Sequence, residues 1–308
     1  MTSDLTPNAD RFSGFSELYD RVRPTPPDDL AEALCAYSGG ARPSLVIDLG
    51  SGTGLSTRWC ARWAERVVGV EPSDDMRGVA EAADDDSPTV TYQRGWSTAT
   101  GLETGCADVV LAAQALHWMD PEPTFAEVAR VLRPGGVFAA IDCDWPPSVG
   151  NATSEAAWGR CRGRVKAFEE RLAAGMTGAT LIAPLGADDD PILPTHFARD
   201  ANRGRQMAVG VQAWSKDDHL DRMQTSGAFA WCREIAFHTS EWGNAGRFVD
   251  LLRSQGDLQT LVKHGVSEAA MGVPEFEAVV TGALGDRPRA FWFTYRARVA
   301  GTAGDDQD

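Results

Sequence analysis

The stretch VIDLGSGTG, residues 46–54, decides the fold class. A short aliphatic run ends around Asp48 and is followed by glycines at every second position. Leu55, Trp59 and Trp63 then recur at the spacing of one helix face, so the segment predicts a strand, a glycine turn and a helix. Glycine before a helix lets the backbone approach a ligand closely, because no Cβ intervenes. The stretch therefore predicts a ligand site at the end of the first strand.

The same alternation continues on the C-terminal side of this turn. Aliphatic runs at residues 67–70, 89–93, 107–116 and 137–141 alternate with helical patterns, one of which spans 121–132 and stops at the RPGG of 133–136. Strands alternating with helices imply right-handed crossovers and a parallel sheet. Two later strands, at 232–240 and 290–299, complete the prediction: an α/β, doubly wound, seven-stranded and mostly parallel sheet with a mainly helical lid from two insertions.

The breaks in the alternation predict the organisation of the chain. Because both insertions leave the sheet after the fifth strand, we expect them to build one lid. The expected segments are an N-terminal helical segment that covers the cofactor (1–40), a cofactor-binding core (41–149), a lid insertion (150–213), a core helix and sixth strand (214–243), a second lid insertion (244–286), the last core strand (287–300) and a disordered tail (301–308).

Two kinds of ligand compete for the glycine turn. Dinucleotide sites require G-x-G-x-x-G/A, whose last position is small so that the helix packs closely on the strand. Here Gly50 and Gly52 fit, but Leu55 occupies that last position. The pattern instead is a carboxylate, Asp48, followed by Gly50, Gly52 and Gly54, and a second carboxylate, Glu71, ends the second strand.

This arrangement resembles motif I of the class I S-adenosylmethionine (SAM)-dependent methyltransferases, which have a Rossmann-like fold. In that family the turn holds the methionine part of SAM, and an acidic residue at the end of the second strand binds the ribose hydroxyls. Glu71 stands at that position, and a carboxylate can accept two hydroxyl hydrogen bonds. The resemblance implies cofactor contacts from Asp48, Gly50, Ser51, Gly52, Thr53, Glu71, Pro72 and Met76.

Further segments resemble the same family over residues 11–145. Trp96 and Ser97 match the place where the family seats the adenine, and an aromatic ring there could stack on it. QALHW (114–118) and the N-terminal FSGFSELYDRVRPTPP resemble the subgroup that includes the trans-aconitate methyltransferases. In that subgroup the N-terminal segment folds over the cofactor, which implies cofactor contacts from Tyr19 and Arg23, although an arginine before a proline could equally be a solvated helix flank. The match of QALHW implies contacts from Gln114 and Ala115 in the floor of the site.

Three residues at the ends of strands are candidates for acid–base chemistry. His117 follows the fourth strand, and its ordinary pKa near ~6.5 suits a general base, although a His-Trp pair could equally form the pocket wall. Asp142 and Asp144 lie two apart at the end of the fifth strand, where they could orient an acceptor or form a solvated strand end. We expect Trp118, Trp145 and Trp214 to contact an apolar acceptor, although such rings could also form the lid's own core.

Composition restricts the partners and the compartment. The formal net charge of −15 argues against nucleic acid, whose phosphates usually require a basic face. The scattered cysteines show no spacing typical of a metal site, no segment is apolar enough to span a membrane, and residues 1–20 do not form a signal peptide. We therefore expect a cytoplasmic monomer or homodimer with no metal.

The predicted function is transfer of a methyl group from SAM to an oxygen, carbon or nitrogen atom of a small, hydrophobic or aromatic acceptor in specialised metabolism. Two alternatives remain at this point: a protein that binds SAM without methylating, as a regulator or for another reaction, and a carboxylate O-methyltransferase of the trans-aconitate type. A nicotinamide oxidoreductase is disfavoured by Leu55 in the turn.

Overall fold

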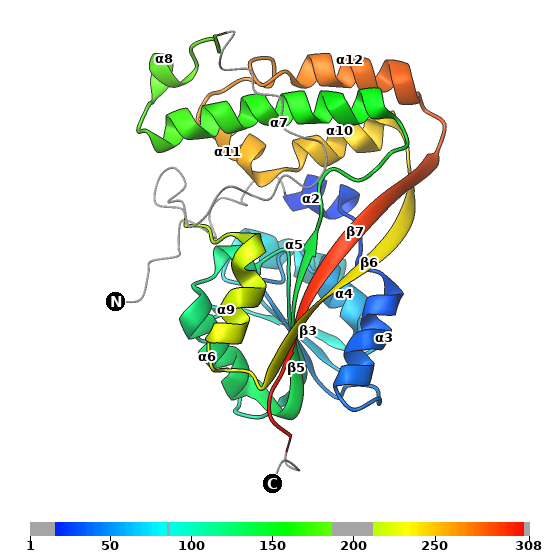
Figure 1. The fold of residues 1–308 in the computed structure, drawn as a ribbon, viewed down its shortest axis with the longest axis vertical. Coiled ribbons are helices and arrows are strands. Elements are labelled where there is room, and N and C mark those ends of the chain that lie inside the picture. Colours follow the sequence, from blue (N-terminus) through cyan, green and yellow to red (C-terminus); the bar gives the residue numbers. More distant parts are fainter. Residues whose placement is uncertain (1–15, 85–86, 187–211, 305–308) are drawn as a thin grey trace.

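A computed structural model of the chain describes residues 16–84, 87–186 and 212–304. Its centre is a seven-stranded sheet of strand order β3-β2-β1-β4-β5-β7-β6 (Figure 1). Strands β1 to β5 are parallel, and β7 runs antiparallel to both of its neighbours. This confirms the predicted seven-stranded, mostly parallel sheet. The strands are β1 (Val46–Leu49), β2 (Val67–Val70), β3 (Val90–Gln93), β4 (Ala107–Ala113), β5 (Leu132–Cys143), β6 (Trp231–Gly243) and β7 (Arg289–Gly301).

Helices cover both faces of the sheet. Helices α3 (Asp28–Tyr37) and α4 (Leu55–Ala61) pack on one face, whereas α6 (Pro121–Val131) and α9 (His219–Thr225) pack on the other (Figure 1). Helix α5 (Asp74–Ala83) packs against β3. Because β1 and β4 are buried on both sides, their sequences are apolar apart from one aspartate each, Asp48 and Asp108, as expected for central strands of a parallel sheet.

A separate group of helices, the lid, lies over one end of the sheet. It contains α2 (Ser16–Val22), α7 (Ala152–Ala173), α10 (Ala245–Arg253), α11 (Gly256–Lys263) and α12 (Val273–Leu284), with the short α8 (Gly178–Leu181) at its margin (Figure 1). Trp158 of α7 packs on Phe248 of α10 and Phe276 of α12, with ring centroids 5.1 and 6.0 Å apart. Helices from both insertions therefore share one aromatic core.

Several predicted boundaries differ from the structure; the strands expected at 107–116, 232–240 and 290–299, for example, span Ala107–Ala113, Trp231–Gly243 and Arg289–Gly301. The helix over 121–132 ends at Val131, and β5 already begins at Leu132, so the RPGG segment lies within that strand. The positive φ of Gly135 and a register shift opposite Ala107 accommodate this irregular start. The helix expected near 216–229 is a 3-10 turn, η3 (Lys216–Asp218), followed by α9.

Parts of the predicted first lid insertion and of the tail lie outside the described residues, at 187–211 and 305–308. Among the residues that the structure describes, no helix combines the length and the apolar composition that crossing a membrane requires.

Candidate cofactor and acceptor site

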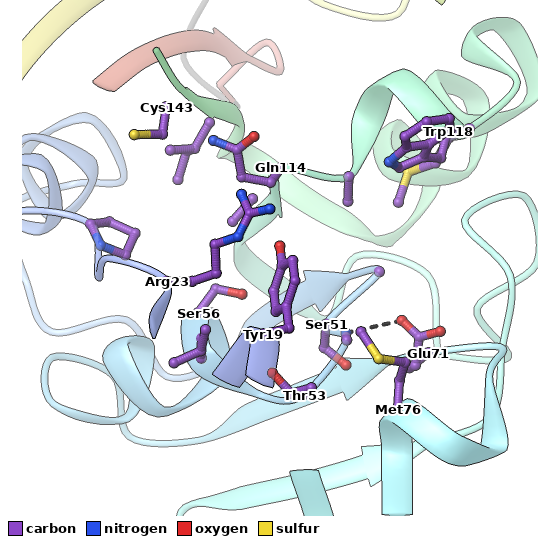
Figure 2. Close-up of a pocket in the computed structure, with 18 of the residues that line it drawn as sticks. Tyr19, Arg23, Ser51, Thr53, Ser56, Glu71, Met76, Gln114, Trp118 and Cys143 are labelled. Atoms are coloured by element: carbon purple, nitrogen blue, oxygen red, sulfur yellow. Dashed lines mark hydrogen bonds between the residues drawn. The ribbon is translucent and has the colours of Figure 1, made fainter. Parts of the chain in front are cut away.

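A cavity lies at the carboxyl ends of β1, β2 and β4, where open parallel sheets usually bind their ligands (Figure 2). Every residue expected to contact the cofactor lines it, with the exception of Asp48. Residues that follow α2 and residues from β5 and β7 contribute the rest of the wall. The predicted residues that line the cavity are Tyr19, Arg23, Gly50, Ser51, Gly52, Thr53, Glu71, Pro72, Met76, Trp96, Ser97, Gln114, Ala115, Trp118 and Trp145.

The glycine turn after β1 is held in a conformation that only glycine adopts readily. Gly50, Gly52 and Gly54 have φ angles of 65°, 56° and 83°. A Cβ on Gly50 would lie 2.9 Å from the Ala115 side chain, and a Cβ on Gly54 would overlap the Tyr92 hydroxyl. The turn therefore packs tightly against the side chains of Ala115 and Tyr92, while the backbone of Gly50 and Gly52 lines the cavity.

Two hydroxyl groups in this turn suit a polar ligand. Ser51 Oγ and Thr53 Oγ1 are buried and have no hydrogen-bond partner among the described residues, and both residues line the cavity. Leaving a buried hydroxyl unsatisfied costs about 1–3 kcal/mol, so a ligand that bonds to it would recover that free energy. The amino and carboxylate groups of the methionine part of SAM have the chemistry to do so.

Glu71 connects the end of β2 to the glycine turn. Its Oε2 accepts a hydrogen bond from the Gly52 N–H at 2.9 Å (Figure 2), and its Oε1 accepts one from the Ser73 N–H at 2.8 Å. Burial raises the pKa of Glu71, while these two backbone bonds lower it. Each carboxylate oxygen can accept a further hydrogen bond, so this residue can still bind a pair of ligand hydroxyls.

The structure does not place Asp48 at the cavity, which corrects one predicted cofactor contact. Its side chain points toward α4, where Oδ2 accepts hydrogen bonds from the Ser56 and Thr57 hydroxyls, both at 2.7 Å. Oδ1 is buried without a partner in the described part of the chain. Burial raises the pKa of Asp48 to about 7. The residue therefore joins β1 to the first turn of α4 and supports the glycine turn from behind.

The predicted adenine side of the site is formed by Trp96, Ser97 and Met76, all of which line the cavity. Ser97 Oγ is within hydrogen-bond distance of Thr124 Oγ1, at 2.9 Å, which anchors this loop to α6. The N-cap hydroxyl of Ser73 accepts a hydrogen bond from the Met76 N–H, which fixes the start of α5 beside the cavity. An aromatic ring and a flexible thioether are suitable walls for a planar base.

Arg23 links the N-terminal segment to the lid and reaches the cavity. Its guanidinium donates to Ser254 Oγ at 3.1 Å and to the Ser254 carbonyl at 2.8 Å. The same group lies 4.6 Å from the ring centroids of both Tyr19 and Trp145. Burial lowers the pKa of Arg23, and the structure pairs it with no carboxylate among the described side chains. A ligand anion at this position would be strongly favoured.

None of the three acid–base candidates lines the cavity. Asp142 is buried in an ion-pair cluster, with Lys216 Nζ at 2.8 Å and Arg298 Nη1 at 2.9 Å. Burial alone would raise the pKa of Asp142, but the cations, with Lys216 foremost, lower it well below its ordinary value. His117 Nδ1 lies 4.0 Å from the same carboxylate. Asp142 is therefore a structural anion rather than a base that faces the acceptor.

Strand geometry explains why the paired carboxylates do not act together. Ile141 and Cys143 line the cavity, so the side chain of Asp142 between them must point to the opposite face of β5. Asp144 lies beyond the end of the strand and pairs with Arg296, whose Nε is 3.1 Å away. The sequence spacing thus placed the two carboxylates on one side, whereas the structure places them in separate ion pairs.

Trp214 is also absent from the cavity lining that the described residues form, which corrects the third predicted acceptor contact. Its backbone N–H donates to the His117 carbonyl at 2.9 Å, so the chain after position 211 packs against the loop that follows β4. His117 and Trp214 therefore lie behind the cavity wall that Gln114, Ala115 and Trp118 form.

Sequence reasoning missed several residues that line the cavity. Tyr295 of β7 is paired in register with Cys143 of β5, so the last strand brings a phenol to this edge of the sheet. Only the antiparallel pairing of distant segments reveals this, because β7 carries no local motif. The other missed residues are Pro24, Pro26, Leu55, Ser56, Val70, Ala113, Met119, Ile141 and Cys143.

A search of the described ranges found no group of three or more histidine, cysteine, aspartate or glutamate side chains that could hold a metal ion.

Comparisons with known proteins agree with this geometry. A family model described as a methyltransferase domain matches residues 47–140. An uncharacterized methyltransferase of Mycobacterium tuberculosis is 41% identical over 126 residues, which cover 41% of this chain and 49% of the relative. A Saccharomyces cerevisiae protein, whose name assigns it to the SAM-dependent methyltransferases, is 31% identical over 128 residues, or 40% of this chain and 44% of the relative. The matches thus span about half of each relative.

Solved structures extend the similarity in fold to most of the chain. A structure from Anaeromyxobacter dehalogenans, whose name assigns it to the type II methyltransferases, aligns with a TM-score of 0.53 at 21% identity, covering 91% of this chain and 97% of that one. The cyclase SpnF aligns with a TM-score of 0.52 at 13% identity and covers 99% of both chains. Residues 47–140, which include the glycine turn, thus match a methyltransferase domain, and the chain shares its overall fold with these solved structures.

Proposed function

We propose that the protein is an enzyme that transfers the methyl group of SAM to an oxygen, carbon or nitrogen atom of a small, hydrophobic or aromatic acceptor in specialised metabolism. The observation that supports this most is that one cavity is lined by the glycine turn, by Glu71 and by the aromatic side chains Trp118 and Trp145. The first two suit SAM, and the aromatic wall suits an apolar acceptor.

Each part of the cavity has a distinct task in this proposal. SAM supplies a methyl group already activated by the positive charge on sulfur. Glu71 accepts the ribose hydroxyls, Ser51 and Thr53 satisfy the polar end of the methionine part, and Arg23 binds its carboxylate. These contacts fix the cofactor so that the acceptor meets the methyl group in line, which supplies much of the rate enhancement in a transfer between two bound molecules.

The cavity walls supply water exclusion rather than proton transfer. Among the described lining residues, Glu71 is the carboxylate, there is no histidine, and burial raises the pKa of the Tyr295 phenol and of the Cys143 thiol. None of these groups is suited to remove a proton from an acceptor at neutral pH. The proposed acceptor therefore reacts through an atom that is already deprotonated or that bears a free lone pair.

The first experiment is calorimetric titration of SAM and of S-adenosylhomocysteine (SAH). The Glu71→Ala variant should bind both at least tenfold more weakly, because it removes the acceptor for the ribose hydroxyls. Its free energy of unfolding should fall by only about 1–3 kcal/mol, since two backbone N–H groups lose their partner. Glu65→Ala, at an exposed position five residues before β2 ends, is the matched control. Unchanged affinity in Glu71→Ala would reject the ribose assignment.

A second experiment separates methyl transfer from cofactor binding alone. The cyclase SpnF shares this fold, so the fold does not by itself identify the reaction. Formation of SAH upon addition of small aromatic acceptors supports the methyltransferase proposal. Tight SAM binding without SAH formation across a broad panel of phenols, amines, carboxylates and carbon acids supports the non-methylating alternative.

A further inference from the structure

Besides Ser51 and Thr53, two side chains of the cavity lining carry a buried polar group with no hydrogen-bond partner among the described residues. Gln114 Nε2 and the Tyr295 hydroxyl are buried, line the cavity and make no hydrogen bond within the described chain. Tyr295 is 2% exposed, and burial raises its pKa, so the phenol keeps its proton and can donate it in a hydrogen bond. Both groups are hydrogen-bond donors that the ligand must satisfy if their burial is not to be unfavourable.

The orientation of the Gln114 amide is fixed by Lys216. Lys216 Nζ donates to Gln114 Oε1 at 2.8 Å and also lies 2.8 Å from Asp142 Oδ1, which in turn pairs with Arg298. An ammonium group can only donate, so the amide oxygen must face it and the NH₂ group must face the other way. The ion pairs of Lys216, Asp142 and Arg298 outside the cavity thereby determine that the NH₂ group of Gln114 faces the cavity.

The backbone at Gln114 is also unusual. Its φ is 55°, and it is the one described residue other than glycine with a positive φ. Its N–H donates to the Ile141 carbonyl at 2.7 Å, which holds the strained conformation. A non-glycine residue in this region costs about 1–3 kcal/mol and persists only where its surroundings impose it. Such strain at the end of β4 is consistent with a side chain whose direction is functionally required.

These donors share the cavity with a cation and with aromatic walls. Figure 2 shows the side chains of Gln114, Arg23 and Tyr19 directed toward the same region of the cavity. The carboxylate among the described lining residues, Glu71, accepts hydrogen bonds at the end of β2 from Gly52 and Ser73. The acceptor part of the cavity therefore offers hydrogen-bond donors and apolar surface, and no competing anion.

We propose that Gln114 and Tyr295 jointly bind an anionic oxygen of the acceptor, and that Lys216 is a positioning residue that holds the Gln114 amide for this task. The acceptor is then an apolar, aromatic molecule that carries a carboxylate or phenolate oxygen. This inference rests on the proposed function, since it concerns the acceptor half of the same cavity. It assigns Gln114, which follows β4 and was expected from the resemblance to contact the cofactor, to the acceptor instead, together with Lys216 of η3 and Tyr295 of β7.

The test uses the full chain with SAH bound, and titrates cinnamate against the neutral cinnamamide by calorimetry. The wild-type chain should prefer cinnamate. Tyr295→Phe removes only the hydroxyl and should reduce cinnamate affinity about tenfold while leaving SAH affinity and folding stability unchanged, because that hydroxyl bonds to no described protein group. Tyr37→Phe, at a partly buried tyrosine of α3 that does not line the cavity, is the matched control.

Two further variants test the positioning role. Gln114→Glu keeps the side-chain shape and its contact with Lys216 but replaces the donor by an anion, so the preference should shift toward cinnamamide. Lys216→Met should reduce the ratio of cinnamate to cinnamamide affinity several-fold, and Lys216→Arg should restore it, which a merely structural role would not produce.

The outcomes separate this inference from the proposed function. If SAH does not bind the wild-type chain, the proposed function fails and the inference fails with it. If SAH binds but the wild-type chain binds both probes equally, or binds neither, the inference is overturned and the proposed function stands. The inference is likewise overturned if the preference for cinnamate is unchanged in both Tyr295→Phe and Gln114→Glu.

Discussion

The buried carboxyl of Asp48 makes the stability of the fold depend on pH in a direction that can be tested. Its side chain is fully buried, and burial raises its pKa from 3.8 to about 7. A carboxyl with a raised pKa in the folded state contributes stability that is fully present below about pH 4 and is lost as the pH rises toward about 7. The shift of about three units corresponds to about 4 kcal/mol. About 3 kcal/mol of this is lost between about pH 5 and about pH 8.

The perturbation that isolates this effect is Asp48→Asn. Asparagine has the same shape and can accept the hydrogen bonds of Ser56 and Thr57 through its oxygen, but it does not titrate. Urea unfolding at about pH 5 and about pH 8 should show that the wild-type chain loses about 3 kcal/mol more than the variant over this range. All other titrating groups are present in both proteins, so their effects cancel in the comparison. Parallel pH dependence in the two proteins would falsify the reasoning that Asp48 resists ionisation in its buried position.

Two further pairs of substitutions test the packing and the ion pairs that support the site. Gly54→Ala should lower the free energy of unfolding by about 2–5 kcal/mol, because the φ of Gly54 is 83° and the new Cβ would overlap the Tyr92 side chain. Gly101 is the control: its φ is 76°, but no atom of the described chain lies within 4 Å of the position of a new Cβ. Gly101→Ala should therefore lower the free energy of unfolding by only about 1–2 kcal/mol in the same urea titration. Asp142→Ala should cost about 3 kcal/mol, because Lys216 and the 3% exposed Arg298 lose this anion. Glu234 Oε2, 2.7 Å from Arg298 Nε, still pairs with Arg298 and keeps the cost at the lower end for a broken buried ion pair. Asp144→Ala, which breaks a partly exposed pair with Arg296, should cost at most about 1 kcal/mol, and equal losses in the two aspartate variants would contradict the assigned difference in burial.

Most of the cavity wall that we propose for SAM could be predicted from the sequence, because its determinants are local. A glycine run between a strand and a helix requires positive φ angles at Gly50 and Gly52, and the alternation of strand and helix brings Glu71 to the neighbouring strand end. These features need no knowledge of distant contacts. The parallel part of the sheet follows from the same local periodicity, since strands that mostly alternate with helices allow few topologies.

The three predicted acid–base residues lie outside the described cavity lining, for a reason that the sequence does not contain. The sequence predicts that His117, Asp142 and Asp144 lie at the carboxyl ends of the strands, and they do. A side chain at that position can, however, point to either face of the sheet. Which face Asp142 takes depends on where β5 begins its alternation, and that start is shifted by an irregular segment around Gly135. A single-residue change of register exchanges every inward and outward side chain, so proximity to the edge does not establish contact with the cavity.

The acceptor half of the site is built from contacts between distant parts of the chain. Lys216 reaches Gln114 across 102 residues, and Arg23 reaches Ser254 across 231. Tyr295 lines the cavity because β7 runs antiparallel beside β5, and no local sequence pattern predicts this pairing. If these long-range contacts select the acceptor, then the lid insertions and the last two strands can vary the substrate while the glycine turn keeps the cofactor. Relatives that match only the segment around that turn would then share SAM and differ in what they methylate. The glycine turn, the motif that is recognised most readily in the sequence, would thus carry the least information about the acceptor.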